Sequence, residues 1–318
     1  MQSGKRLRWQ AMSNNEFDVA IIGGGPAGVT AGIYATRSNL NTVILEGMAV
    51  GGQINSTQTV DNFPGLGEIS SLDLCQKFNE HAEALGVNII YDEATKVDFS
   101  GETKVVKTGY SGDILAKTVI IATGARARRL NLENEEKLIG NGICFCAICD
   151  GNLFKDKDVI VAGGGNSAVE EAIYLSKIVK SVTLINAVKG LQANASLVEK
   201  LHKIPNISCK LNHLIVKLNG EDKFSGACIK DNETGEETIV NASGLFISIG
   251  RVPNTELFKG QLELNKNGYI VTNEDLMTSA SGVYAAGDVR EKKIRQIITA
   301  CSDGAICAIN CAGYIKAY

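Results

Sequence analysis

The feature that most constrains the fold of this chain is an internal repeat with an offset of 140 residues. Residues 19–47 (VAIIGGGPAGVTAGIYATRSNLNTVILEG) align without a gap on residues 159–187 (VIVAGGGNSAVEEAIYLSKIVKSVTLINA). Each copy reads as an apolar strand, a glycine-rich turn, a helix and a second apolar strand, which is the βαβ unit that binds a dinucleotide. The glycine positions are Gly23, Gly25 and Gly28 in the first copy, and Gly163, Gly165 and Ala168 in the second.

The glycines and an acid in the first copy predict a nucleotide site. The first glycine permits a tight turn, the second lets the backbone approach a pyrophosphate, and the third lets helix and strand pack closely. Glu46 follows Gly28 by 18 residues, where a carboxylate can accept both ribose hydroxyls. The second copy predicts a second dinucleotide site, with Asn186 in the place of Glu46; the alternative is a structural relic with an empty site. Its expected residues are Gly163, Gly165, Asn166, Ser167 and Asn186.

Two further glycine-terminated strands place the second copy inside the first domain. TVIIATG (118–124) and GVYAAGD (282–288) flank it, and Asp288 is a candidate acceptor for a ribityl or ribose hydroxyl. The predicted fold is α/β with two Rossmann-like three-layer dinucleotide-binding domains, the second inserted in the first. The expected boundaries are a disordered extension at 1–15, a split domain at 16–124 and 251–318, and an inserted domain at 125–250.

Composition excludes several classes of protein. The net charge is −3 without a basic stripe, so we expect no nucleic-acid partner. The apolar runs are too short for a membrane helix, and the N-terminus lacks the apolar core of a secretory signal. A secreted disulfide scaffold would be shorter and denser in cysteine than 318 residues with nine cysteines. We therefore expect a cytoplasmic protein.

The stretch CFCAICDG (144–151) contains a C-x-x-C motif, Cys146 to Cys149. A metal site needs four ligands; Cys144 would be a third, but the three histidines are scattered, so no metal is expected. A disulfide that closes so short a loop stabilises little. A redox dithiol remains, and Asp150 is the natural proton donor and acceptor beside it, with a turn residue or helix N-cap as the alternative. Cys144 is interpreted as a spectator.

At this point the chain resembles the low-molecular-weight thioredoxin reductases of the bacterial and archaeal type, over about residues 16–317. The resemblance is carried by CAICDG (146–151) between two nucleotide-binding units, and by further matching stretches. These are GGGPAG (23–28), GGQ (51–53), VDNFPG (60–65), ATG (122–124), GGGNSAVEEA (163–172), GRVPNT (250–255), AAGDV (285–289) and RQ (295–296).

The resemblance implies a homodimer with FAD in the split domain and a nicotinamide-type inserted domain that carries the C-x-x-C. It implies that Cys149 faces the flavin, that Cys146 attacks thioredoxin, and that Asp150 is the acid/base. It also implies rotation of the inserted domain on linkers near 125 and 250. The residues implied to line FAD are Gly23, Gly25, Pro26, Ala27, Glu46, Gly51, Gly52, Gln53, Asn62, Thr123, Asp288, Arg295 and Gln296.

One departure concerns the electron donor. NADPH-using members of the family carry a His-Arg-Arg-x-x-x-Arg stretch that holds the 2′-phosphate, but this chain has NAVKGLQ at 186–192. The donor is thus NADH, NADPH, or another carrier such as ferredoxin. The function expected is a flavin-dependent thioredoxin-disulfide reductase. The alternatives are a related disulfide reductase that serves a peroxiredoxin, a dithiol oxidase, and a redox sensor without turnover.

Overall fold

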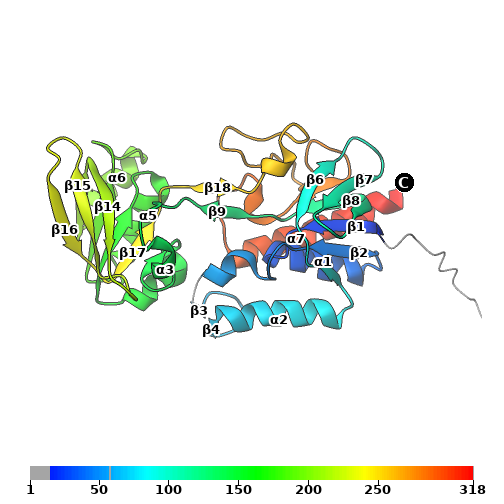
Figure 1. The fold of residues 1–318 in the computed structure, drawn as a ribbon, viewed down its shortest axis with the longest axis horizontal. Helices are drawn as coiled ribbons and strands as arrows, with labels where there is room; N and C mark the ends of the chain where they lie inside the picture. The colour runs from blue at the N-terminus through cyan, green and yellow to red at the C-terminus, as the bar shows by residue number, and fades with distance from the viewer. Residues whose placement is uncertain (1–14, 57–58, 318) are drawn as a thin grey trace, which may run out of the picture. The chain divides into compact units, whose positions relative to one another are not determined.

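The computed structural model describes residues 15–56 and 59–317 of the chain. The expected extension at 1–15 lies outside the described residues except for Asn15. The described chain divides into two compact units (Figure 1). Unit 1 is made of the described parts of Met1–Ile54, Leu74–Ala125 and Pro253–Tyr318, and unit 2 of Asn55–Asp73 and Arg126–Val252. The segment 55–73, which we expected in the split domain, therefore groups with unit 2.

Unit 1 is built on a seven-stranded sheet in the order β5-β2-β1-β8-β7-β6, with β19 also paired to β8. The first half of β8 pairs with β7 in antiparallel fashion, and its second half pairs with β19 in parallel. The strands that precede a crossover are parallel, as βαβ units require. The bounds are β1 (Glu16–Ile22), β2 (Thr42–Leu45), β5 (Asn88–Ile90), β6 (Ala94–Asp98), β7 (Lys104–Thr108), β8 (Asp113–Ile121) and β19 (Val283–Ala285).

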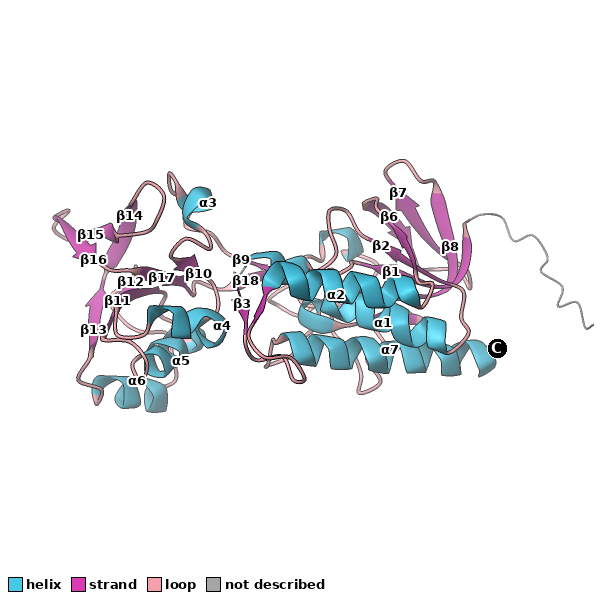
Figure 2. Ribbon diagram, turned by 90° about the horizontal axis from the view of Figure 1, so that it is seen from below, coloured by secondary structure: helices cyan, strands magenta, loops and turns pink. Residues whose placement is uncertain are grey.

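Both faces of this sheet are buried, which explains why β1 is apolar without alternation from Val19 to Ile22. Val19 and Ile21 face a core that includes α1 and α7, whereas Ala20 and Ile22 face a second core with Phe99 and other side chains. Figure 2 shows α1 and α7 running along one face of the sheet. The helices are α1 (Pro26–Arg37), α2 (Ser71–Ala84) and α7 (Ile297–Ala317), with 3₁₀ turns η1 (Gly52–Ser56), η3 (Glu256–Phe258) and η4 (Gly287–Val289).

In helix α7, residues Ile297–Lys316 are long and apolar enough to cross a membrane, by length and composition only. This differs from the expectation that the apolar runs are too short for a membrane helix. In the structure this helix packs along α1. Gly304 permits the close approach, since a Cβ there would overlap the carbonyl oxygen of Ala27. Cys307 and Cys311, four residues apart on one face, are both fully buried in the core of unit 1. These contacts are those of a core helix.

Unit 2 contains a five-stranded parallel sheet in the order β10-β17-β11-β12-β13. Its register repeats that of unit 1 with the 140-residue offset: Val159 pairs with Val182 as Val19 pairs with Thr42. The bounds are β10 (Ile143–Cys144), β11 (Asp158–Ala162), β12 (Ser181–Asn186), β13 (Ile207–Leu211) and β17 (Gly244–Ile247). The helices of unit 2 are α3 (Glu135–Leu138), α4 (Ala147–Asp150), α5 (Asn166–Leu175) and α6 (Ala195–His202), with the 3₁₀ turn η2 (Gly151–Phe154).

The sheet of unit 2 is covered on both faces as well. Val159 and Val161 face a core shared with α5 and α6, whereas Ile160 and Ala162 face a core shared with a three-stranded antiparallel sheet. That sheet has the order β14-β15-β16, made of β14 (His213–Asn219), β15 (Gly226–Asp231) and β16 (Glu237–Asn241). Unit 2 thus has three layers: helices, the parallel sheet and the antiparallel sheet. This arrangement confirms the α/β fold class with Rossmann-like units. The short strands β3 (Thr59–Val60) and β4 (Ile69–Ser70) pair separately.

The chain passes between the units twice, and the two passages pair with each other. Strands β9 (Ala125–Ala127) and β18 (Arg251–Pro253) form a two-stranded sheet. Backbone hydrogen bonds continue the pairing on either side, from Arg128 N to Gly250 O in unit 2 and from Asn254 N to Gly124 O in unit 1. The linkers expected near 125 and 250 thus form one ribbon.

Candidate active site

The glycine turn of unit 1 forms a cradle at the N-terminus of α1. Gly23 has a φ of +107°, and a Cβ at this position would collide with the carbonyl oxygen of Ala122. A Cβ at Gly28 would overlap the carbonyl oxygen of Gly23, so this position also excludes a side chain. At Gly25 the nearest atom to an added Cβ is the Cα of Gly52 at 4.0 Å. The space at Gly25 is therefore open, and its occupation by a methyl group would narrow the cradle.

Glu46 lies at the rim of this cradle. Its Oε2 accepts a hydrogen bond from Gly24 N at 2.6 Å, and its Oε1 accepts one from Met48 N at 2.9 Å. Two backbone donors thus fix the carboxylate just after β2. No side chain caps α1, so its first N–H groups and the positive end of its dipole remain available to an anion. These features fit the pyrophosphate and the ribose of a dinucleotide.

The structure gathers most of the residues expected to line FAD in unit 1. Gly51 N donates to Gly24 O at 2.9 Å, and a Cβ at Gly287, next to Asp288, would lie 3.0 Å from the Cβ of Ala27. The backbone N of Thr123 lies 3.1 Å from the Cβ position of Gly23. The members found in unit 1 are Gly23, Gly25, Pro26, Ala27, Glu46, Gly51, Gly52, Gln53, Thr123, Asp288, Arg295 and Gln296.

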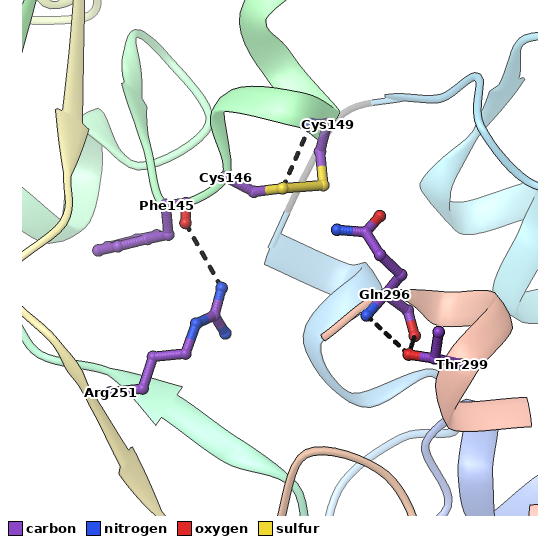
Figure 3. Close-up of a disulfide and its surroundings, with 6 residues drawn as sticks. All are labelled: Phe145, Cys146, Cys149, Arg251, Gln296 and Thr299. Carbon is purple, nitrogen blue, oxygen red and sulfur yellow. Dashed lines mark hydrogen bonds between the residues drawn. A yellow bond between two sulfur atoms is a disulfide. The ribbon is translucent and has the colours of Figure 1, made fainter. Parts of the chain in front are cut away.

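Three of the expected FAD residues need separate mention. Arg295 holds its guanidinium 4.4 Å from the centroid of the Tyr269 ring, and Gln296 N donates to Thr299 Oγ1 at 3.1 Å just before α7 (Figure 3). Asn62 is exposed in the connection between β3 and β4, which groups with unit 2. Unit 1 by itself does not contain it.

Unit 2 repeats the cradle. Gly163 has a φ of +139°, and nothing lies within 4 Å of a Cβ built at Gly165. Helix α5 begins at Asn166 without a side-chain cap, as α1 does at Pro26. Ser167 is the exposed second residue of α5, and Ala168, in the place of Gly28, is fully buried. The second copy of the repeat therefore retains the shape of a pyrophosphate site.

The rim of the second cradle differs from the first. Asn186 does not present its amide as Glu46 presents its carboxylate: its Nδ2 donates to Gly190 O at 2.7 Å and to Val188 O at 3.4 Å. Gln192 N donates to Gly164 O at 2.7 Å, which closes the stretch 186–192 over the glycine turn. Lys189 is the sole basic residue of this stretch, and its Nζ lies 2.9 Å from the Glu233 carboxylate.

Cys146 and Cys149 form a disulfide in unit 2, with their Cα atoms 5.3 Å apart (Figure 3). Cys146 is the N-cap residue of α4, and Cys149 N donates a hydrogen bond to the Cys146 Sγ at 3.2 Å. Both cysteines are half-buried, and Ile148 between them is exposed. The backbone of α4 thus places a hydrogen-bond donor on the Cys146 sulfur, which would stabilise a thiolate formed there. Among the residues described, no cluster of three or more His, Cys, Asp or Glu side chains is placed to hold a metal ion.

The family model for pyridine nucleotide-disulphide oxidoreductases matches residues 17–304, nearly the whole chain. The chain belongs to this family. It is 45% identical over 303 residues to a 34.2 kDa protein in a rubredoxin operon of Clostridium pasteurianum, covering 94% of this chain and 97% of that protein. It is 40% identical to the thioredoxin reductase of Peptoclostridium acidaminophilum, covering 95% and 98% of the two chains.

A crystal structure of thioredoxin reductase from Streptococcus pyogenes superposes with a TM-score of 0.90 at 40% identity, covering 96% of this chain and all of that one. These likenesses confirm the low-molecular-weight thioredoxin reductase family that the motifs indicate. In this chain the glycine turns at Gly23 and Gly163 both adopt positive φ, and Cys146 and Cys149 form a disulfide.

For this disulphide oxidoreductase, the surroundings of Asp150 are the part that sequence reasoning missed. Asp150 is 6% exposed at the end of α4, so it is not a solvated turn residue. The thiol of Cys144, also buried, hydrogen-bonds to Asp150, and burial together with the Asp150 charge raises the pKa of Cys144 far above its usual range. Cys144 is therefore a neutral thiol that donates to the candidate acid/base, rather than a spectator.

Arg251 is a second residue that motif reasoning left without a role. Its Nη2 donates to the carbonyl oxygen of Phe145 at 3.4 Å (Figure 3). Phe145 is the residue between Cys144 and Cys146. Arg129 lies over the Phe145 ring at 5.4 Å from its centroid. Two arginines thus hold the segment that leads into the disulfide. The motif GRVPNT includes Arg251, but nothing in the sequence pairs it with a residue 106 positions earlier.

Proposed function

We propose that this chain is a flavin-dependent thioredoxin-disulfide reductase whose electron donor is not selectively NADPH. Bound FAD would supply two electrons from the donor, and the Cys146–Cys149 dithiol would deliver them to the disulfide of thioredoxin. The observation that carries the proposal is the disulfide beside a buried acid, Asp150, in a chain with two dinucleotide cradles. Two relatives that are 40% identical to this chain are named thioredoxin reductases, which supports thioredoxin as the substrate.

The residues of unit 1 would hold FAD by its pyrophosphate and ribose. The N-terminus of α1 would bind the pyrophosphate, and Glu46 would accept the ribose hydroxyls. When bound, FAD supplies a two-electron carrier between the donor and the dithiol. The protein contributes the cradle and the fixed carboxylate, and both exist without the cofactor.

We assign Cys146 as the sulfur that attacks thioredoxin. The hydrogen bond from Cys149 N stabilises a negative charge on Cys146 Sγ, which favours the reactive thiolate. The Cys146 thiolate attacks one sulfur of the thioredoxin disulfide and forms a mixed disulfide, while the other thioredoxin sulfur leaves and takes a proton. Cys149 then attacks Cys146 Sγ, so the Cys146–Cys149 disulfide re-forms and the thioredoxin dithiol is released. Asp150 is next to both steps and serves as acid and base.

The donor proposal rests on the rim of the second cradle. A 2′-phosphate carries nearly two negative charges, and arginine would bind it through two parallel hydrogen bonds. The stretch 186–192 has no arginine, and its one lysine is already paired with Glu233. The pyrophosphate cradle at Gly163 and Gly165 remains, which supports a nicotinamide donor without a strong preference for the phosphate.

A second donor class is favoured by the same observation. The side-chain Nδ2 of Asn186 already donates to the carbonyl oxygens of Val188 and Gly190. Asn186 therefore has fewer hydrogen-bonding groups left for a ribose than the carboxylate of Glu46 has in unit 1. A reduced protein carrier such as ferredoxin would need no ribose site. We place this class second, since the glycine geometry of the pyrophosphate cradle is retained.

The decisive experiment is anaerobic spectroscopy of the purified protein with bound FAD. NADH, NADPH, reduced ferredoxin and photoreduced deazaflavin are added in turn, and bleaching of the flavin absorbance is followed before oxidised thioredoxin is added. We expect NADH and NADPH to bleach it at comparable rates, and thioredoxin to restore it. Bleaching by ferredoxin alone would assign the donor to the second class. A reduced protein that transfers no electrons to thioredoxin would overturn the function itself.

We also propose that the protein is a homodimer, as in the family it resembles. Ile298, Ile306 and Ile309 are exposed on α7, and Ile294 is exposed just before it. Such a row of apolar side chains on one helix suits a self-association surface. Light scattering coupled to gel filtration of the flavoprotein tests the proposal, and a monomer at micromolar concentration would refute it.

A further inference from the structure

Unit 2 contains a further, half-buried carboxyl group that the proposed mechanism does not use. Glu171 lies in α5, in the stretch that follows the second glycine cradle. Its Oε2 is buried without a hydrogen-bond partner in the structure, whereas a hydroxyl, Ser248, hydrogen-bonds to the same side chain. A largely buried carboxyl with one unsatisfied oxygen is costly if it is ionised and unpaired. Such a group needs a role.

Glu171 lies on the face of α5 that packs against the segment just after the disulfide. A Cβ at Gly151, the residue after Asp150, would lie 3.1 Å from Leu175 Cδ2 and 3.4 Å from Tyr174 Cε1. Glu171 precedes these two residues by four and three positions, so all three lie on the face of α5 that α4 touches. The carboxyl group of Glu171 is therefore on the same side of α5 as Asp150.

The electrostatics around Glu171 agree with this placement. Burial raises its pKa to about 7, and the charges of Asp150 and of its neighbour Glu170 raise it as well, against the hydrogen bond from Ser248 and the charge of Arg251. The groups facing it are thus Asp150 from α4, Arg251 from β18 and Ser248 after β17, with Cys144 of β10 bound to Asp150. When two carboxyl groups interact in a buried site, a charge on one raises the pKa of the other, so the pair can hold a shared proton.

We propose that Glu171 holds the proton that Asp150 exchanges with the Cys146–Cys149 couple. Glu171 acts through Asp150 and is a positioning residue, and the inference rests on the proposed function of the dithiol. On reduction, two electrons enter the disulfide and the S–S bond breaks. Asp150 gives a proton to the Cys146 sulfur, and the Cys149 sulfur keeps the other electron pair as a thiolate. Glu171 then gives its proton to Asp150, and solvent reprotonates Glu171. On oxidation of the dithiol the proton returns by the same path.

A purely structural role for Glu171 makes a different prediction. In that case the side chain only braces Arg251 and Ser248, and its removal would lower stability without altering how the dithiol responds to pH. A proton carrier, by contrast, sets a break in the pH profile at its own pKa. The pH dependence of the dithiol reaction distinguishes the two roles, whereas the reaction rate at a single pH does not.

The test follows the oxidation of the reduced dithiol by the small disulfide DTNB in stopped flow, from acid to alkaline pH through 7. Enzyme with bound FAD is first reduced with dithiothreitol and desalted anaerobically, so neither the electron donor nor thioredoxin is involved. The variants are Glu171→Gln, Glu171→Asp and the control Glu170→Gln, which removes an exposed charge one residue away on the same helix. This design keeps the result independent of thioredoxin as the substrate.

We expect the native rate to rise through a break near pH 7, the pKa of Glu171. Glu171→Gln should lose this break and slow the reaction at alkaline pH about tenfold or more, within the range of general acid–base effects. Glu171→Asp should restore part of the rate with a break, and Glu170→Gln should keep a break that moves toward lower pH, because the charge of Glu170 raises the pKa of Glu171. A Glu171→Gln variant with full FAD content and the native rate and break would overturn the proposal.

A measurement on the native protein covers the case in which Glu171→Gln does not fold. Infrared difference spectra of disulfide reduction are recorded with unlabelled protein and with protein grown on ¹³C-carboxyl glutamate. We expect a protonated carboxyl band that changes on reduction and shifts with the label, because a glutamate rather than Asp150 holds the proton. A difference spectrum without a glutamate carboxyl band would refute the inference.

Discussion

Lys189 Nζ lies 2.9 Å from the Glu233 carboxylate, and this ion pair engages the one basic side chain of the stretch 186–192 at the rim of the second cradle. Both side chains are mostly exposed, so the pair is worth little to stability. Its consequence is chemical: the rim of the second cradle offers no free cation from this stretch to a 2′-phosphate.

The donor prediction follows from that pair. The ratio of kcat/KM for NADPH to that for NADH should lie within about tenfold, since each hydrogen bond to a charged group is worth roughly 1.5–3 kcal/mol and the arginine bonds are missing. The double substitution Ala187→Arg and Val188→Arg, at two exposed positions, should raise this ratio by tenfold or more. Steady-state rates at saturating thioredoxin measure it. A native preference for NADPH of a hundredfold would show that other residues bind the phosphate.

The cysteine prediction separates redox chemistry from folding. Cys146→Ser or Cys149→Ser should lower thioredoxin reduction more than about a thousandfold, because serine cannot form or break the disulfide. Each variant should keep its FAD, since the cradle lies in unit 1. Cys228→Ser is the matched control in unit 2, on β15 and away from the disulfide segment. Near-native turnover in either motif variant would move the redox centre elsewhere.

The two cradles predict a reciprocal pair of glycine variants. Gly25→Ala places a methyl group in the open space at α1, where the backbone is extended and no neighbour blocks it, so the protein should fold but bind FAD about tenfold or more weakly. Gly165→Ala makes the same change at α5 and should leave FAD bound while nicotinamide binding weakens. Flavin content and titration of each dinucleotide measure the two effects. Stoichiometric FAD in Gly25→Ala would argue against this cradle as its site.

Local pattern predicted the parts of the fold that repeat. The 140-residue offset fixed both βαβ units, and even the register of β1 with β2 recurs between β11 and β12. The pattern could not reveal contacts between distant segments. Arg251 bonds to Phe145 across 106 residues, and Glu171 in α5 reads in the sequence as an ordinary amphipathic helix position. Tertiary packing, which no local window contains, makes these residues part of the candidate site.

The last prediction concerns stability and pH at Glu171. Its ordinary pKa of 4.5 is raised to about 7 in the folded protein, chiefly by burial. Below 4.5 the carboxyl is protonated in both the folded and the unfolded state, so the folded state carries no penalty. As the pH rises to 7 the unfolded state ionises first, and the folded protein loses stability. Above 7 the full cost applies, on the order of 3 kcal/mol at about 1.4 kcal/mol per pKa unit.

Glu171→Gln imitates the protonated side chain at every pH, so the variant and the native flavoprotein should melt at similar temperatures near pH 4. Above pH 7 the variant should be the more stable by several degrees, because it lacks the buried charge. Melting curves of both proteins with FAD bound, followed by circular dichroism across this pH range, measure the difference. Glu170→Gln should still lose stability as the pH rises toward 7, by slightly less than the native protein, because the charge of Glu170 contributes to the raised pKa of Glu171. A Glu171→Gln protein that melts below the native one at alkaline pH would mean that the ionised carboxylate, paired with Arg251, stabilises the fold.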